Sequence, residues 1–144
     1  MGKALWTGCI AVTVLAGLAA CSLTTDERDE MAEQLYDRNW IASQIEGVPA
    51  AGVTSTLMIA SDGKVSGNAG CNGYFGSAIV DDSAIAFGNL GTTRRACPEP
   101  AMSQEDRMLR ALDSTRGYRL EQQDLLLLDA GGNMILRFTL GESA

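Results

Sequence analysis

Short apolar runs broken by turn-forming residues make up most of the chain after Asn39. The runs at 40–45 and 53–60 contain β-branched residues, and the second alternates apolar and polar positions, which is typical of half-buried strands. Asp62-Gly63 then leads into a run that begins at Lys64. Both residues of this dipeptide tolerate the positive φ of a type I′ turn, so the pattern predicts a hairpin.

The same pattern of two apolar runs around a turn occurs again further along the chain. Residues 77–90 contain two apolar runs on either side of Asp81-Asp82-Ser83, which predicts a second hairpin. Residues 118–140 contain three short apolar runs, separated by Gln122-Gln123 and by "AGGN" at 130–133. Both separators are acceptable hairpin turns, so the C-terminal part is also predicted to be antiparallel sheet.

The period changes between residues 101 and 115, where apolar side chains recur at helical spacing. Pro98 and Pro100 precede this stretch and Gly117 follows it, as is typical of the two ends of a helix. We expect its apolar stripe to pack on the core rather than to bind a partner. Antiparallel strands with a single helix and no alternating strand–helix series predict an α+β fold. We expect a small curved or barrel-like antiparallel β-sheet with one packed α-helix.

The N-terminus has the pattern of an export signal. One cation, Lys3, precedes an uncharged and mostly apolar stretch from Ala4 to Ala20, slightly short of the roughly 20 apolar residues of a spanning helix. Leu18-Ala19-Ala20-Cys21 resembles the lipobox of bacterial lipoproteins, in which the cysteine thiol receives a diacylglycerol and the chain is cut just before it. An uncleaved anchor helix is the alternative, and both readings tether an exported protein to a membrane.

These patterns divide the chain into a lipoprotein signal peptide (1–20), an acidic tether (21–37) and one domain (38–141). Lipidation of Cys21 and of its new amine would exceed the single acyl chain that binds a bilayer only marginally. Ser22, and not an aspartate, follows that cysteine, which favours the outer membrane by resemblance to enterobacterial sorting. We therefore expect a lipid-anchored protein on the periplasmic face of the outer membrane.

The charge of the chain limits its partners. The formal charge is −7, and loss of Lys3 with the signal peptide makes it −8. An acidic surface repels nucleic-acid phosphates and anionic lipid headgroups. We expect no nucleic-acid partner, and we expect membrane contact through the lipid.

The sequence contains no histidine. This absence excludes Ser-His-Asp and Cys-His catalysis, and it removes the commonest transition-metal ligand. We predict no enzymatic activity, no cofactor and no metal site.

Two cysteines remain for the mature domain, because Cys9 leaves with the signal peptide and Cys21 carries lipid. Cys71 and Cys97 would meet an oxidising compartment, are too far apart for a Cys-x-x-Cys redox motif, and lack the histidines of a zinc site. We expect a structural disulfide worth roughly 3 kcal/mol in the chain-entropy model. The alternative is a reactive Cys71 thiolate stabilised by a nearby arginine.

The stretch "SGNAGCNGYFGS" at 66–77 carries a glycine at every third position. A phosphate-binding loop would open a helix and include a lysine, but nothing helical follows and Lys64 is the last lysine of the chain. The economical interpretation is a sharp corner between strands, in which Asn72 bonds local backbone and Tyr74 and Phe75 cover the corner.

Three segments, taken together and in this order, form a recognisable pattern: "GNAGCNGYFG", then "TTRRACPEPAMSQEDRMLRAL", then "YRLEQQDLLLLDAGGNMILRF". They resemble the META domain of HslJ-like heat-inducible bacterial lipoproteins, over about residues 38 to 140 of this chain. The matching positions are Trp40, Gly70-Cys71-Asn72, Thr93, Arg94, Cys97 and the acidic helix start around Glu105.

The resemblance implies a small antiparallel β structure that carries one helix. Members of the family are linked to heat stress, to tolerance of the antibiotic novobiocin and, in some parasites, to virulence and secretion. The fold is also similar to that of a lipoprotein pilot for secretin assembly. The resemblance identifies no catalytic residue.

Our first hypothesis is a lipid-anchored envelope protein without catalysis, which binds or supports envelope components, including under heat or antibiotic stress. We expect its interaction surface near the Cys71–Cys97 corner, with Asn72, Tyr74, Arg94 and Arg95 exposed. The alternative for the two arginines is that one of them pairs with a carboxylate of the helix. The partner is either an envelope protein or a small apolar ligand, and an open apolar cavity inside the sheet would favour the ligand.

Two other functions remain as alternatives. A hydrolase would use paired carboxylates, for which Asp81-Asp82 and Glu99 with Glu105 are the available clusters. Adjacent aspartates point to opposite faces of a strand, so Asp81-Asp82 is better explained as a hairpin turn. A pilot or chaperone for a secretion channel rests on analogy of fold alone.

Overall fold

The computed structural model describes residues 29–141 except 31 and 51. The predicted signal peptide, the lipobox with Cys21, and Ser22 lie outside the described residues. The elements are β1 (Trp40–Ile45), β2 (Val48–Pro49), β3 (Thr56–Ile59), β4 (Lys64–Asn68), β5 (Gly73–Asp81), β6 (Ala84–Phe87), β7 (Gly91–Thr92), α2 (Ala101–Ser114), β8 (Gly117–Glu121), β9 (Asp124–Leu128) and β10 (Met134–Leu140).

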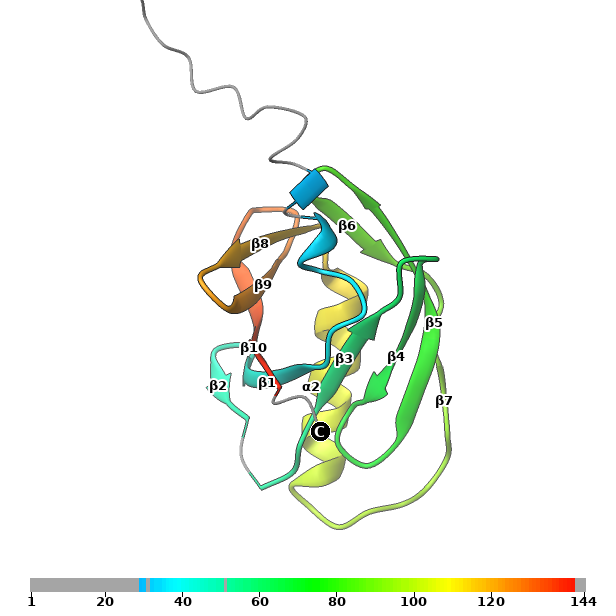
Figure 1. Ribbon diagram of the computed structural model, residues 1–144. Helices are drawn as coiled ribbons and strands as arrows, with labels where there is room; N and C mark the ends of the chain where they lie inside the picture. The colour runs from blue at the N-terminus through cyan, green and yellow to red at the C-terminus, as the bar shows by residue number, and fades with distance from the viewer. Residues whose placement is uncertain (1–28, 31, 51, 142–144) are drawn as a thin grey trace, which may run out of the picture.

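The strands form one antiparallel sheet that closes into a ring. Their order is β10-β9-β8-β6-β5-β4-β3-β1-β2, with β7 beside β5, and a further pairing of β1 with β10 closes the sheet. The helix α2 lies between the β8–β10 side and the β3–β5 side of this ring (Figure 1) and contacts β1, β6 and β10. The prediction of a curved antiparallel sheet with a packed helix is confirmed.

The inside of the ring is a packed core. The helix contributes Met108, Ala111 and Leu112, which are buried with side chains from the strands, so its apolar stripe packs on the core as expected. The strand residues of this core include Trp40, Ile45, Leu57, Ile59, Val65, Tyr74, Ile85, Tyr118, Leu125, Leu127, Leu136 and Phe138.

The hairpins occur where the sequence predicts them. Asp82 has a φ of 52° between β5 and β6, and Gln122 has a φ of 58° between β8 and β9. The turn between β3 and β4 differs from the expected type I′ geometry, because Gly63 has a φ of 83° and Asp62 has no positive φ. The amide of Gly63 donates to the carbonyl of Ala60 and closes a turn of three residues with glycine in its last position.

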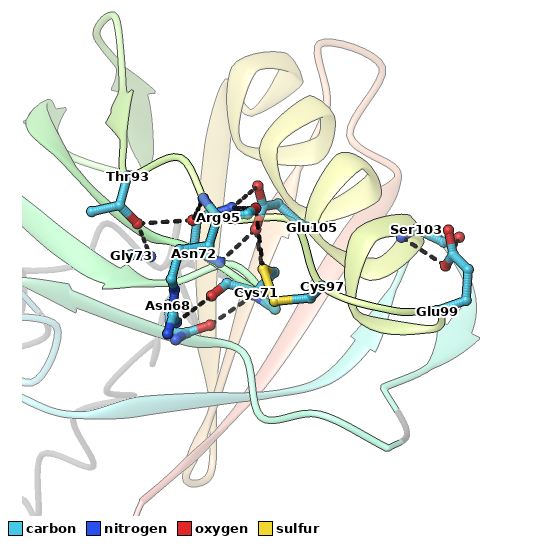
Figure 2. Close-up of a disulfide and its surroundings, with 11 residues drawn as sticks. Asn68, Cys71, Asn72, Gly73, Thr93, Arg95, Cys97, Glu99, Ser103 and Glu105 are labelled. Atoms are coloured by element: carbon cyan, nitrogen blue, oxygen red, sulfur yellow. Dashed lines mark hydrogen bonds between the residues drawn. A yellow bond between two sulfur atoms is a disulfide. The ribbon is translucent and has the colours of Figure 1, made fainter.

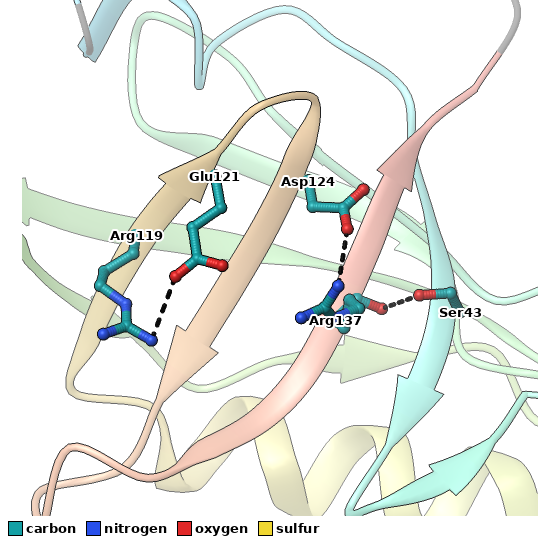
Figure 3. A network of polar contacts seen from close by, with 5 residues as sticks. All are labelled: Ser43, Arg119, Glu121, Asp124 and Arg137. Atoms are coloured by element: carbon teal, nitrogen blue, oxygen red, sulfur yellow. Dashed lines mark hydrogen bonds and ion pairs between the residues drawn. The ribbon is translucent and has the colours of Figure 1, made fainter.

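The outer face of β8, β9 and β10 carries charged pairs around an apolar residue. Leu126 lies in register between Arg119 and Arg137, and its exposed fraction is only 2%. Arg137 pairs with Asp124 at 2.9 Å, and Arg119 pairs with Glu121 at 3.3 Å (Figure 3). The arginine stems beside Leu126 can cover it while their charged ends stay in water.

Part of the segment expected to be a tether packs on the domain. Leu35 is fully buried in the core, and its carbonyl accepts a hydrogen bond of 3.1 Å from the indole of Trp40. The amide of Asp37 donates to the carbonyl of Ile59 at the end of β3. A single leucine in a polar stretch has no periodicity to reveal it, which is why the sequence pattern missed this contact.

Gly67 lies where two strands and a tyrosine approach closely. The hydroxyl of Tyr74 donates a 2.7 Å hydrogen bond to the carbonyl of Thr56, and burial raises the pKa of Tyr74. A Cβ on Gly67 would lie 2.1 Å from that carbonyl oxygen and 2.7 Å from the Tyr74 hydroxyl. The position therefore has no room for a side chain.

We predict that Gly67→Ala lowers the free energy of unfolding by about 2 kcal/mol, because the added methyl group overlaps backbone that cannot move alone. Gly73→Ala is the matched control, since its Cβ would meet its nearest atom at an ordinary 3.7 Å. The control should change stability by no more than about 0.5 kcal/mol. Urea denaturation measures both, and equal effects would contradict this account of Gly67.

Candidate functional site

The candidate site is the disulfide corner, which we define as residues 69–73, the loop 93–100 and Glu105. Cys71 and Cys97 are joined by a disulfide with a Cα–Cα distance of 5.8 Å across 26 positions of sequence. The expected disulfide is present, and a reactive Cys71 thiolate is excluded while it is intact. The bond fixes the loop before α2 to the turn between β4 and β5.

Glu105 joins the helix to this turn. Its side chain is buried, and one carboxylate oxygen accepts hydrogen bonds from the amides of Cys71 at 3.2 Å and Asn72 at 2.6 Å. The other oxygen accepts a hydrogen bond from the Asn72 side chain at 3.0 Å (Figure 2). A carboxylate accepts hydrogen bonds only, so these three donors suit it and stabilise the charge that burial would otherwise penalise.

Asn72 joins the same turn to the loop 93–100. Its side-chain oxygen accepts hydrogen bonds from the amide of Arg95 at 2.7 Å and from the hydroxyl of Thr93 at 3.0 Å. Its side-chain nitrogen donates to the carbonyl of Arg95 at 3.0 Å. The guanidinium of Arg95 donates to the carbonyl of Cys71 at 2.9 Å. Asn72 thus bonds backbone distant in sequence, where the sequence pattern suggested local backbone.

Gly70 allows the helix to approach the turn. Its φ is +149°, and a Cβ there would lie 2.7 Å from the carbonyl oxygen of Ala101 and 3.1 Å from the amide of Glu105. The glycine stretch therefore forms the strand-to-strand corner that the sequence predicts, and the first turns of α2 pack directly on it.

A second polar link holds the helix at the neighbouring position. The side chain of Gln104 donates 2.8 Å hydrogen bonds to the carbonyl of Val53 and to the hydroxyl of Ser55. Ser55 in turn donates to the carbonyl of Ala69 at 2.9 Å. Gln104 therefore fixes α2 to the segment before β3, and Glu105 fixes it to the turn between β4 and β5.

Four residues were expected to be exposed on the interaction surface, and two of them are exposed. Arg94 and Arg95 are exposed, but Asn72 and Tyr74 have exposed fractions of only 2%. The expectation was wrong for Asn72 because Glu105, Thr93 and Arg95 surround its amide, and for Tyr74 because its ring packs in the core.

The alternative that an arginine pairs with a helix carboxylate is also wrong. Arg95 bonds the carbonyl of Cys71. In the described part of the chain, the guanidinium of Arg94 has no hydrogen-bond or ion-pair partner, and the same holds for Arg38. Arg94 is therefore a free cation on a loop fixed by the disulfide.

The carboxylates proposed for a hydrolase have separate structural roles. Glu99 accepts hydrogen bonds from the amide and hydroxyl of Ser103 at the first turn of α2, and these bonds lower the pKa of Glu99. Glu105 points away from Glu99, toward Asn72 (Figure 2). Asp81 ends β5 and Asp82 lies in the hairpin turn, as the sequence analysis favoured. Glu99 and Glu105 therefore do not form an acid–base pair (Figure 2).

The described residues offer neither a membrane-spanning helix nor a metal-binding cluster. Within residues 29–141 as described, no helix is long and apolar enough to cross a bilayer. In the same part, no three cysteine, aspartate or glutamate side chains come together in a way that could hold a metal ion.

We predict that Glu105→Gln lowers the free energy of unfolding by about 2 kcal/mol, because an amide cannot accept all three hydrogen bonds and turns a donor toward donors. Asp106→Asn is the matched control, since Asp106 is the next residue of α2 and is exposed. It should change stability by about 0.5 kcal/mol or less. Thermal or urea unfolding decides between them, and similar losses in both variants would refute the role given to Glu105.

Comparison with solved structures shows three similar chains. An NMR structure of a protein from Burkholderia xenovorans is 28% identical, with a TM-score of 0.61, and the match covers 99% of this chain and 100% of that one. A second NMR structure is 21% identical with a TM-score of 0.60, over 75% of this chain and 92% of that one. A crystal structure of a DUF4847 family protein from Bacteroides vulgatus is 14% identical with a TM-score of 0.61, over 78% and 98%. The last two show similarity of fold alone.

Comparison of the sequence with known proteins and protein families identifies the family of this chain. No curated protein matches the sequence. The model of the META domain matches residues 33–142, which include the corner, the loop 93–100 and Glu105. This family and the structural neighbours fit a domain without catalysis. The chain belongs to the META domain family.

Proposed function

We propose that this protein is a lipid-anchored envelope protein that binds an envelope component through the loop 93–100 and catalyses no reaction. The observation that carries the proposal is Arg94, an exposed guanidinium without a partner among the described residues, on a loop held by a disulfide. A free arginine offers planar, bidentate recognition of a carboxylate or phosphate. The partner would present such an anion to the loop.

The rigidity of the loop favours binding. Hydrogen bonds from Thr93 and Arg95 to Asn72 fix the residues on both sides of Arg94. A loop that is already ordered loses little conformational entropy when a partner binds. The other polar side chains of the corner (Asn72, Thr93, Arg95, Glu99 and Glu105) each have a hydrogen-bond partner, which leaves the guanidinium of Arg94 as the group available for recognition.

The remaining parts of the proposal come from the N-terminal sequence and the family. The lipobox-like Leu18-Ala19-Ala20-Cys21 supports anchoring through Cys21, and Ser22 supports the outer membrane, with the domain on the periplasmic side. The resemblance to heat-inducible lipoproteins supports a role in envelope maintenance under heat or antibiotic stress.

We predict that Arg94→Gln lowers the yield of a specific crosslink between this protein and its partner. A photo-crosslinking amino acid placed at exposed Ala96 of the full chain in living cells should give a defined adduct, and its yield should fall about tenfold in Arg94→Gln because a charge-assisted contact is lost. Arg38→Gln is the control, since Arg38 is also exposed and without a partner among the described residues. Equal adducts in all three proteins would contradict the proposed surface.

We predict that Cys21→Ser abolishes both lipid attachment and cleavage before residue 21. Mass spectrometry of the wild-type protein should find an acylated Cys21 as the first residue, and fractionation should place it with the outer membrane. The variant should keep its N-terminal segment and lose the lipid mass. An unmodified Cys21 in the wild-type protein would contradict the anchoring proposal.

A further inference from the structure

A depression of ≈ 680 Å³ lies beside the point where the chain enters β1. It is formed by the segment 36–39, by Met58 and Ser61 near the end of β3, and by the end of β10. The depression is separate from the disulfide corner, because none of its lining residues belongs to that corner. Its size is in the usual range of small-ligand sites.

The backbone around the depression is fixed. The amide of Asp37 donates to the carbonyl of Ile59 at 2.8 Å, and the amide of Gly141 donates to the carbonyl of Asn39 at 2.8 Å. Figure 1 shows the corresponding cyan segment running down to the start of β1 near β3. The segment before β1 is therefore tied both to β3 and to the residue that follows β10.

The charged residues of the depression are free to meet a ligand. Arg38 is exposed and has no partner among the described residues, and the same is true of Glu33 and Asp37. The two carboxylates and the guanidinium give the depression a net negative charge, with groups of both signs present. A purely anionic ligand would be repelled, whereas a ligand with both an amine and a phosphate would pair with both signs.

Apolar and aromatic side chains lie beside these charges. Met58 and Leu140 are both exposed, with exposed fractions of 40% and 36%. Tyr36 also lines the depression and packs partly on the core. The aromatic face suits an ammonium group, and the two exposed side chains suit the first methylenes of an acyl chain.

We propose that this depression binds a zwitterionic headgroup that contains a phosphate and an amine. Arg38 would pair with the phosphate, and Glu33 and Asp37 would pair with the ammonium. Met58 and Leu140 would contact the first methylenes of an attached acyl chain. A phospholipid is the favoured source. This preference rests on the proposed lipid anchor, because the 17 positions from Cys21 to Arg38 (38 − 21) span at most about 56 Å when extended, so the depression can reach the bilayer that holds the lipid. The headgroup chemistry itself is independent of the anchor.

The test uses native mass spectrometry on the full chain, purified in mild detergent and titrated with three probes. These are dihexanoyl-phosphatidylethanolamine, dihexanoyl-phosphatidylglycerol and free O-phosphoethanolamine. We expect the ethanolamine lipid to bind at least about tenfold more tightly than the glycerol lipid, because the latter lacks the ammonium and meets two carboxylates. Weaker but measurable binding of the free headgroup would support the headgroup contacts, and tight binding of the free headgroup equal to that of the lipid would overturn the lipid source.

Matched variants locate the binding. Arg38→Gln and Asp37→Asn should each weaken binding of the ethanolamine lipid about tenfold, and asparagine tolerates the positive φ of 54° at position 37. Arg94→Gln should leave lipid binding unchanged, just as Arg38→Gln should leave the partner crosslink unchanged. Equal affinity for the two lipids, or unchanged binding in Arg38→Gln with a native circular dichroism spectrum, would overturn the proposal. Because the probes are added in solution, failure of the Cys21 anchor would not alter these outcomes.

Discussion

The structure of the disulfide corner depends on the carboxylate of Glu105. Its two oxygens accept hydrogen bonds from the backbone of Cys71 and Asn72 and from the Asn72 side chain. A buried carboxylate is costly without donors and becomes a strong link when its donors are fixed. The donors belong to a turn between two strands and the acceptor belongs to the helix. The carboxylate of Glu105 therefore links the helix to the ring of strands. The disulfide adds a covalent link at the same place.

This arrangement supports the proposal that the corner binds a partner and does not catalyse a reaction. Asn72 and Thr93 bond each other, Arg95 bonds both Asn72 and Cys71, and Glu99 accepts hydrogen bonds from Ser103 in the first turn of α2. Their polar groups hold the scaffold in place, whereas the guanidinium of Arg94 stays exposed on the surface of that scaffold. The ring behind it is filled by apolar side chains from the strands and α2. A stable core and a braced loop together hold one exposed cation in a defined position.

Much of the fold follows from local sequence. The hairpin turns at Asp82 and Gln122 and the limits of α2 are set by short-range conformational preferences, which a single sequence displays. The disulfide follows from counting cysteines. The role of Glu105 does not follow, because its partners lie more than thirty positions away and their approach depends on the space at Gly70. The burial of Asn72 and Leu35 was missed for the same reason, since a polar residue and an isolated leucine carry no periodic signal of tertiary contact.

Native-state hydrogen exchange tests most directly whether the Glu105 carboxylate holds the corner rigid. The amides of Cys71, Asn72 and Arg95 each donate to a side chain within the corner. If these bonds set the structure, the three amides should exchange only through global unfolding, with the same free energy as the core amides of β9 and β10. Fast exchange of Cys71 and Asn72 through local opening, with the disulfide intact, would contradict the account.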